Sequence, residues 1–245
     1  MSSQYIFEVR LKGEIPEDVY FHSIPAIRSL ASAPLLFDKP VTFFVGENGS
    51  GKSTLLEAIA VKYGFNPEGG TRDYGFKTAD THSELYKHII LAKRFRPCDG
   101  FFLRAESFYN FATDVDGRRK DDAFAYKNYG GRSLHTRSHG ESFAALIKNR
   151  FFGKGLYILD EPEAALSVSS QYMLLSKIHK LVNDESQFII ATHSPILTGY
   201  PDADIYEFSE YGIEKVVYEQ TDNYRLTKEF VNGRDRVCSM LFEEE

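Results

Sequence analysis

The sequence predicts an α/β fold with a mixed, mostly parallel sheet, an antiparallel β edge and a small helical lid subdomain. The first supporting observation is the alternation of two kinds of segment along the chain. Short apolar runs typical of buried strands (41–45, 101–106, 156–161 and 188–192) alternate with segments of helical spacing (54–63, 141–152 and 170–182). Such alternation is typical of a parallel sheet covered by helices on both faces. The second observation is a glycine-rich stretch directly after the first of these strands.

The remaining segments complete a single domain. Residues 4–15 and 88–92 predict further strands, and residues 206–220 predict a closing hairpin with its turn at 210–212. The Gly-, Asn- and Pro-rich stretch 64–80 predicts a loop. We expect one lobe built from about 1–105 and 153–245. The lid would then occupy about 106–152, with one helix over 112–126.

Composition limits the class of protein. The chain has 245 residues, of which 42% are hydrophobic and 26% charged, as in a globular protein with a sizeable core. Its net charge of −6 disfavours non-specific binding to nucleic acid. The two cysteines lack metal-ligand spacing, residues 1–5 lack the blocks of a signal peptide, and no apolar run reaches about 18 residues. We therefore expect a cytoplasmic protein.

The glycine-rich stretch matches the G-x-x-x-x-G-K-[ST] phosphate loop between a strand and a helix. In such a loop successive backbone N–H groups and the helix N-terminus form an anion site. Lys52 is then placed to reach the β- and γ-phosphates, and the Ser53 hydroxyl to ligate Mg²⁺. The motif predicts a P-loop NTPase that binds a nucleoside triphosphate. Its residues are Gly46, Glu47, Asn48, Gly49, Ser50, Gly51, Lys52, Ser53 and Thr54.

Polar residues follow two later strands. Asp160 and Glu161 follow an apolar strand, where Asp160 can hold Mg²⁺ and Glu161 can orient and deprotonate an attacking water. The alternative is that the two acids only begin a turn. His193 follows the next strand, within reach of a γ-phosphate, because ligands of open α/β sheets gather at this edge. The alternative for His193 is a structural loop histidine.

Five motifs in this order resemble those of ABC-type ATPases of the SMC/RecF-like head class. More narrowly, the chain is similar to small stand-alone bacterial ATPases of the AAA family. The resemblance implies ATP and Mg²⁺ as ligands, with catalysis by Glu161, His193 and Lys52. It also implies a homodimer that sandwiches two ATP molecules. The motifs are GENGSGKST (46–54), SHGES (138–142), LYILDEP (156–162), EAALS (163–167) and ATHSP (191–195).

The resemblance also assigns roles to individual residues. Ser138, Gly140 and Glu141 match the signature that contacts the γ-phosphate held by the opposite subunit, although His139 departs from the usual glycine. The alternative is an ordinary glycine-containing helix N-cap. Glu106 matches the position of a glutamine that approaches the metal. Arg28 resembles an arginine that contacts nucleotide in some head ATPases.

The sequence leaves several hypotheses for the process that ATP binding and hydrolysis would drive. The 85 residues from Ser53 to Ser138 hold no sustained heptads, so the long coiled coil of SMC proteins is missing. One hypothesis is a DNA-related or defence process with DNA or a protein effector as partner. Others are the ATP-binding subunit of a membrane transporter and a nucleotide-gated binding module with little turnover. A group of basic residues in the middle of the chain favours the DNA hypothesis, and the alternative is that they form an ordinary solvated surface. They are Arg94, Arg96, Arg104, Arg118, Arg119 and Lys120.

Overall fold

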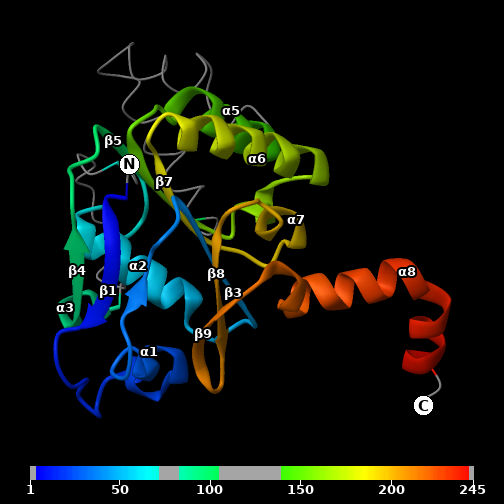
Figure 1. The fold of residues 1–245 in the computed structure, drawn as a ribbon, viewed down its shortest axis with the longest axis horizontal. Coiled ribbons are helices and arrows are strands. Elements are labelled where there is room, and N and C mark those ends of the chain that lie inside the picture. The colour runs from blue at the N-terminus through cyan, green and yellow to red at the C-terminus, as the bar shows by residue number, and fades with distance from the viewer. Residues whose placement is uncertain (1–3, 72–82, 105–138, 243–245) are drawn as a thin grey trace.

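The centre of the computed structural model is a six-stranded sheet with strand order β5-β6-β7-β3-β8-β9 (Figure 1). The structure describes residues 4–71, 83–104 and 139–242. Five of the strands are parallel, and β9 pairs antiparallel with β8. The mixed, mostly parallel sheet predicted from the sequence is therefore confirmed. The strands are β3 (Val41–Gly46), β5 (Asp99–Arg104), β6 (Gly155–Asp160), β7 (Gln187–Ala191), β8 (Asp204–Ser209) and β9 (Gly212–Val216).

Helices cover both faces of this sheet. On one face lies α2 (Lys52–Tyr63), and on the other lie α5 (His139–Arg150) and α6 (Val168–Asn183) (Figure 1). Side chains of β3 alternate between the two faces, so that Phe44 joins the apolar cluster under α2 and Phe43 joins the cluster under α5 and α6. Both clusters are fully buried at the strands, which explains why these strands read as continuous apolar runs.

The antiparallel edge is a second sheet rather than an extension of the first. It has the order β2-β1-β4, with both pairs antiparallel, and consists of β1 (Ile6–Leu11), β2 (Leu35–Leu36) and β4 (Ile89–Lys93). A buried glutamine joins it to the central sheet. The Gln187 side chain accepts hydrogen bonds from the N–H groups of Tyr5 (2.8 Å) and Ile6 (2.9 Å) and donates one to the Ile6 carbonyl (2.7 Å).

The last helix, α8 (Asp222–Phe242), extends away from the body of the molecule and buries none of its residues (Figure 1). This helix was not predicted from the sequence. Within the described part of the chain, no helix has the length and apolar character needed to cross a membrane. The short helices are η1 (Tyr20–Ser23), α1 (Pro25–Ser29), α3 (Leu85–His88), η5 (Pro162–Ala165), α7 (Pro195–Thr198) and η6 (Tyr218–Gln220).

Several predicted elements agree with the observed ones to within a few residues. The predicted hairpin is β8-β9, whose turn is at Glu210 and Tyr211, and the predicted helices 54–63, 141–152 and 170–182 correspond to α2, α5 and α6. The predicted helix 112–126, most of the lid and the second half of the loop 64–80 lie outside the described residues. The division into lobe and lid stays a prediction.

Replacing Gln187 with alanine is expected to destabilise the protein by about 2–4 kcal/mol, because three buried backbone groups lose their partner. Urea denaturation followed by circular dichroism measures this loss. Asn232→Ala removes an exposed amide from α8 and is the matched control, which should cost less than about 0.5 kcal/mol. Equal stability of the two variants would show that Gln187 does not join the sheets.

Candidate functional site

Strand register brings the predicted site residues to one edge of the central sheet. Ala191 of β7 lies opposite Phe44 of β3 on one side and Asp160 of β6 on the other, and Asp160 in turn pairs with Arg104 of β5. The segments that follow these four positions therefore leave the sheet together. Ligands of open α/β sheets bind at this carboxyl edge.

Close packing fixes the path of the phosphate loop. Gly46 has φ +128°, and a Cβ there would lie 2.2 Å from the Phe208 carbonyl oxygen. Gly51, the residue before α2, has φ +100°, and its Cβ would lie 2.6 Å from Ile24. Side chains are excluded at both positions, so the loop backbone approaches its neighbours and opens toward solvent. Glu47, Asn48 and Gly49 are exposed, Thr54 is half-buried, and the first turn of α2 offers its free N–H groups to an anion.

Lys52 is buried at the base of this loop, with 4% of its surface exposed. Its ammonium donates to the carbonyl oxygens of Gly46 (2.8 Å) and Glu47 (2.7 Å). Burial lowers the pKa of Lys52, and the nearby carboxylates, Glu161 first, act in the opposite direction. Close by in the loop, the Ser50 hydroxyl is buried without a hydrogen-bond partner among the described residues. A desolvated cation beside an unpaired hydroxyl fits a phosphate group.

Ser53 and Asp160 fit a magnesium ion. The Ser53 hydroxyl donates to Asp160 Oδ1 at 2.9 Å, which joins the start of α2 to the end of β6. Hydroxyl and carboxylate oxygens are the ligands that Mg²⁺ prefers, completed by phosphate and water oxygens. Among residues 4–71, 83–104 and 139–242, no three His, Cys, Asp or Glu side chains gather as a metal cluster. The third predicted ligand, Glu106, lies outside the described residues.

Glu161 stands in a strained backbone conformation immediately after β6. Its φ of +48° and ψ of +52° are left-handed, although it is not a glycine. This costs about 1–3 kcal/mol, and such strain concentrates at functional sites. The Glu161 N–H donates to the Ala191 carbonyl at 2.9 Å, which anchors the turn to β7. The carboxylate is 40% exposed and its Oε1 lies 3.5 Å from His193 Nε2.

An acid from the neighbouring loop holds the backbone of His193. Its backbone N–H donates to Glu163 Oε1 at 2.5 Å. Within the described part of the chain, His193 Nε2 and Glu163 Oε2 are both buried without a hydrogen-bond partner. Buried polar atoms in native proteins are generally paired, so these atoms point to a ligand or water at this place. Glu163 belongs to the 163–167 motif, but its contact with His193 was not predicted from the sequence.

The structure describes Gly140, Glu141 and Arg28 among the remaining predicted site residues. Gly140 lies in the first turn of α5, where a Cβ would be 3.1 Å from the Ala165 carbonyl oxygen, and Glu141 is exposed beside it. Helix α5 therefore contacts η5. Ser138 lies outside the described residues. Arg28 is exposed on α1, the helix that follows Ile24 and thus begins beside Gly51.

A buried ion pair behind the site was missed by the sequence analysis. Arg104 donates to Glu57 Oε2 of α2 at 2.5 Å, and its Nε lies 3.9 Å from Asp160 Oδ2. Glu57 also accepts the Ser83 N–H at 2.9 Å. Since only 21% of the Arg104 side chain is exposed, its interpretation as a solvated surface residue is wrong. The pair connects the phosphate-loop helix to the acid at the end of β6.

This site defines a P-loop NTPase. A glycine-rich loop after a strand surrounds the buried Lys52, and the next residue, Ser53, is hydrogen-bonded to Asp160. Residues 23–191 match the family model of the AAA domain, so the chain belongs to the AAA domain family. This confirms the AAA-family resemblance stated from the motifs. No curated protein matches the sequence.

Several solved structures show a distant similarity to this chain. The SMC head domain from Thermotoga maritima is 17% identical, with a TM-score of 0.42 over 87% of this chain and 99% of that chain. An inward-facing metal-chelate type ABC transporter is 16% identical, with a TM-score of 0.47 over 91% and 88%. The ADP conformation of an ATP-binding cassette of an ABC transporter is 16% identical, with a TM-score of 0.45 over 74% and 82%.

A double-mutant cycle tests the Arg104–Glu57 pair. Arg104→Met leaves the Glu57 carboxylate buried without its cation and should lower the free energy of unfolding by about 3 kcal/mol. The double variant Glu57→Gln/Arg104→Met should recover at least about 1 kcal/mol of that loss. Urea denaturation of the four proteins measures both values. Strictly additive effects would mean that the two charges do not depend on each other.

Proposed function

We propose that this protein binds Mg-ATP at the 46–54 loop and hydrolyses it to ADP and phosphate. The proposal is carried by one observation. Lys52 and the Ser53–Asp160 pair lie at the same sheet edge as three buried polar atoms that have no hydrogen-bond partner among the described residues. These atoms are Ser50 Oγ, Glu163 Oε2 and His193 Nε2. The buried cation suits a phosphate, and the hydroxyl–carboxylate pair suits its magnesium ion. The magnesium ion would neutralise phosphate charge when bound.

The remaining roles follow from the side chains of the chain itself. Glu161 would accept the proton of a water whose oxygen attacks the terminal phosphorus, as the bond to the ADP oxygen breaks. Its half-exposed carboxylate can reach a solvent molecule, and its left-handed backbone holds that carboxylate next to β7. Lys52 would stabilise charge on the transferred phosphoryl group. His193 would direct its Nε2, which lies 3.5 Å from Glu161 Oε1, to the same group.

We infer further that two copies close around two ATP molecules. In this arrangement Ser138, Gly140 and Glu141 of one copy would face the nucleotide held by the other, at the N-terminus of α5. Contacts that only ATP supplies would favour the closed dimer, and hydrolysis would release it. The packing of α5 against η5 supports this proposal, because it places Gly140 next to the loop that carries Glu161 and Glu163, called here the acidic loop. The proposed output is a DNA-related or defence process acting through an effector.

Glu161→Gln is expected to leave ATP affinity within about twofold while lowering turnover by about 100-fold or more, since a general base contributes 10²–10⁴-fold. Phosphate release and equilibrium binding of a fluorescent ATP analogue measure the two quantities. Lys52→Ala is the matched control and should lose binding itself. Wild-type turnover in Glu161→Gln would remove Glu161 from the mechanism.

Mass in solution tests the composite site. Light scattering of Glu161→Gln should give a monomer alone and a dimer with Mg-ATP, because trapped nucleotide holds the closed state. The double variant Lys52→Ala/Glu161→Gln should stay monomeric under both conditions. A mass that is the same with and without Mg-ATP would contradict the ATP-sandwiched dimer, while the proposal of ATP binding would still stand.

The other outputs are distinguished by further measurements. Filter binding of duplex DNA at low salt, with and without Mg-ATP, tests the DNA-related process. Turnover that is negligible in the wild type would favour the nucleotide-gated binding module, which the departure at His139 motivates. Co-purification with a membrane protein would favour the transporter subunit.

A further inference from the structure

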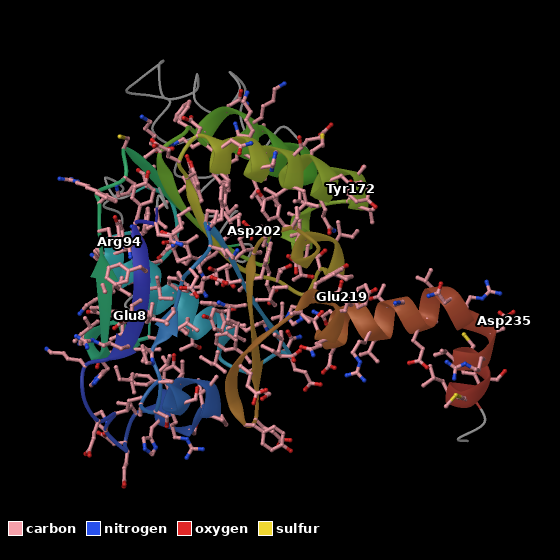
Figure 2. The ribbon with its side chains drawn as sticks, viewed as in Figure 1. Glu8, Arg94, Tyr172, Asp202, Glu219 and Asp235 are labelled. Atoms are coloured by element: carbon pink, nitrogen blue, oxygen red, sulfur yellow. The ribbon has the colours of Figure 1, made fainter. Side chains whose placement is uncertain are left out.

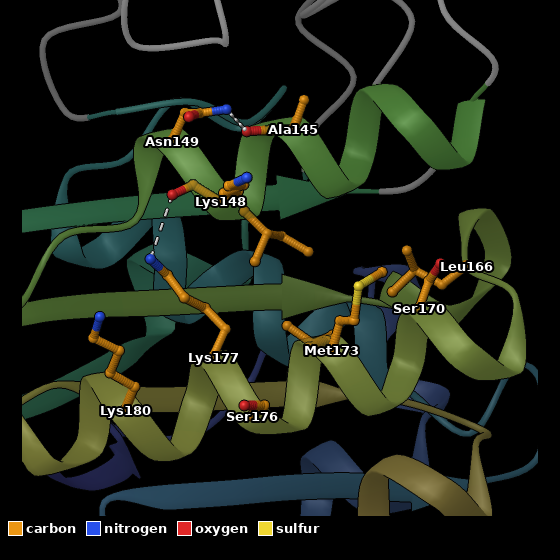
Figure 3. Close-up of a pocket in the computed structure, with 11 residues that line it drawn as sticks. Ala145, Lys148, Asn149, Leu166, Ser170, Met173, Ser176, Lys177 and Lys180 are labelled. Carbon is orange, nitrogen blue, oxygen red and sulfur yellow. Dashed lines mark hydrogen bonds between the residues drawn. The ribbon is translucent and has the colours of Figure 1, made fainter.

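A groove of about 680 Å³ lies between α5 and α6, on the sheet face opposite α2 (Figure 3). The nucleotide site does not include it. Its two ends differ in chemistry. Three lysines gather at one end, Lys148 from α5 with Lys177 and Lys180 from α6, and apolar side chains line the other end around Met173 and Leu166 (Figure 3).

The lysine end is cationic and uncompensated. No Asp or Glu lines the groove, and within the described part of the chain none of the three lysines forms an ion pair. Lys177 donates to the Lys148 carbonyl oxygen at 3.5 Å, in the last turn of α5 (Figure 3). Partial burial and the neighbouring Lys180 charge lower the pKa of Lys177. A carboxylate placed here would relieve the repulsion between the ammonium groups.

The other end of the groove is apolar and partly open to solvent. Met173 is 58% exposed, while Ile147 and Leu166 are buried at the floor. Tyr172, the neighbour of Met173 on α6, is also exposed (Figure 2). Methionine has a flexible, polarizable side chain that adapts to different apolar partners. An apolar surface that continues a charged one marks a binding surface for protein more than for a phosphate backbone.

We propose that this groove binds an acidic segment of a partner protein. One apolar side chain of the segment would enter between Ile147 and Met173, and its carboxylates would lie over Lys148, Lys177 and Lys180. A protein segment fits better than nucleic acid because the apolar floor offers nothing to phosphates. In addition, the net charge of −6 repels a long polyanion. This surface goes beyond the proposed ATPase function and does not depend on it.

The test starts from a displayed library of random 12-residue peptides selected on the wild-type protein. Selected peptides should combine several Asp or Glu residues with one or two large apolar residues. Synthetic fluorescent copies should bind about tenfold more weakly or worse to Lys148→Glu/Lys177→Glu/Lys180→Glu, and also lose affinity as salt is raised. Met173→Ser should weaken binding severalfold. The control Lys12→Glu/Lys87→Glu/Lys228→Glu makes the same charge change at exposed positions elsewhere and should bind as the wild type.

Several results would overturn the proposal. These are a selection that enriches no acidic peptide, equal binding by the groove and control variants, and groove-dependent binding of 20-base-pair DNA in place of peptide. Circular dichroism checks folding, and the milder Lys177→Gln replaces the triple variant if that variant unfolds. It should still bind severalfold more weakly. Lys52→Ala keeps the groove, so its peptide binding is measured separately from any failure of the ATPase proposal.

Discussion

The structure depends on the parallel register of β3, β7, β6 and β5. This register sets Phe44, Ala191, Asp160 and Arg104 in one row, so the loops that follow all leave the sheet at the same edge. A shift by one residue in any strand would turn its side chains to the other face. The phosphate loop, the acids at the end of β6 and the histidine after β7 are far apart in the sequence. They lie side by side because of this alignment.

Local patterns made much of the fold and of the site predictable. The phosphate loop is a contiguous motif whose glycines serve positions that no side chain can occupy, such as Gly46 against Phe208. Asp160 and His193 were predicted because Asp160 ends a buried strand and His193 lies two residues after the next one, and strand ends can be recognised from apolar runs. The alternation of strands and helices along the chain then predicted a mostly parallel sheet. Ser138 and Glu106 are still predictions.

The features that escaped prediction join residues far apart in the chain. Arg104 pairs with Glu57 across 47 positions, and Gln187 bonds to Tyr5 across 182. Neither contact has a local pattern, because a buried charge or amide is recognisable only once its partner is placed. Helix α8 escaped for the opposite reason. Its apolar side chains face solvent, so the rule that apolar periodicity faces a core gave no guide to its place.

The contact between Gly140 and the Ala165 carbonyl has a thermodynamic consequence. A Cβ on Gly140 would lie 3.1 Å from that oxygen, so the absence of a side chain at this position lets α5 and η5 pack together. Helix α5 forms one wall of the lysine groove, and Leu166, the residue after η5, forms part of its floor. A groove ligand that bound one arrangement of these elements more tightly than another would be coupled to residues 160–163 only where a ligand there also distinguished the two arrangements. Linkage then requires that a ligand of the acidic loop change affinity at the groove by the same factor.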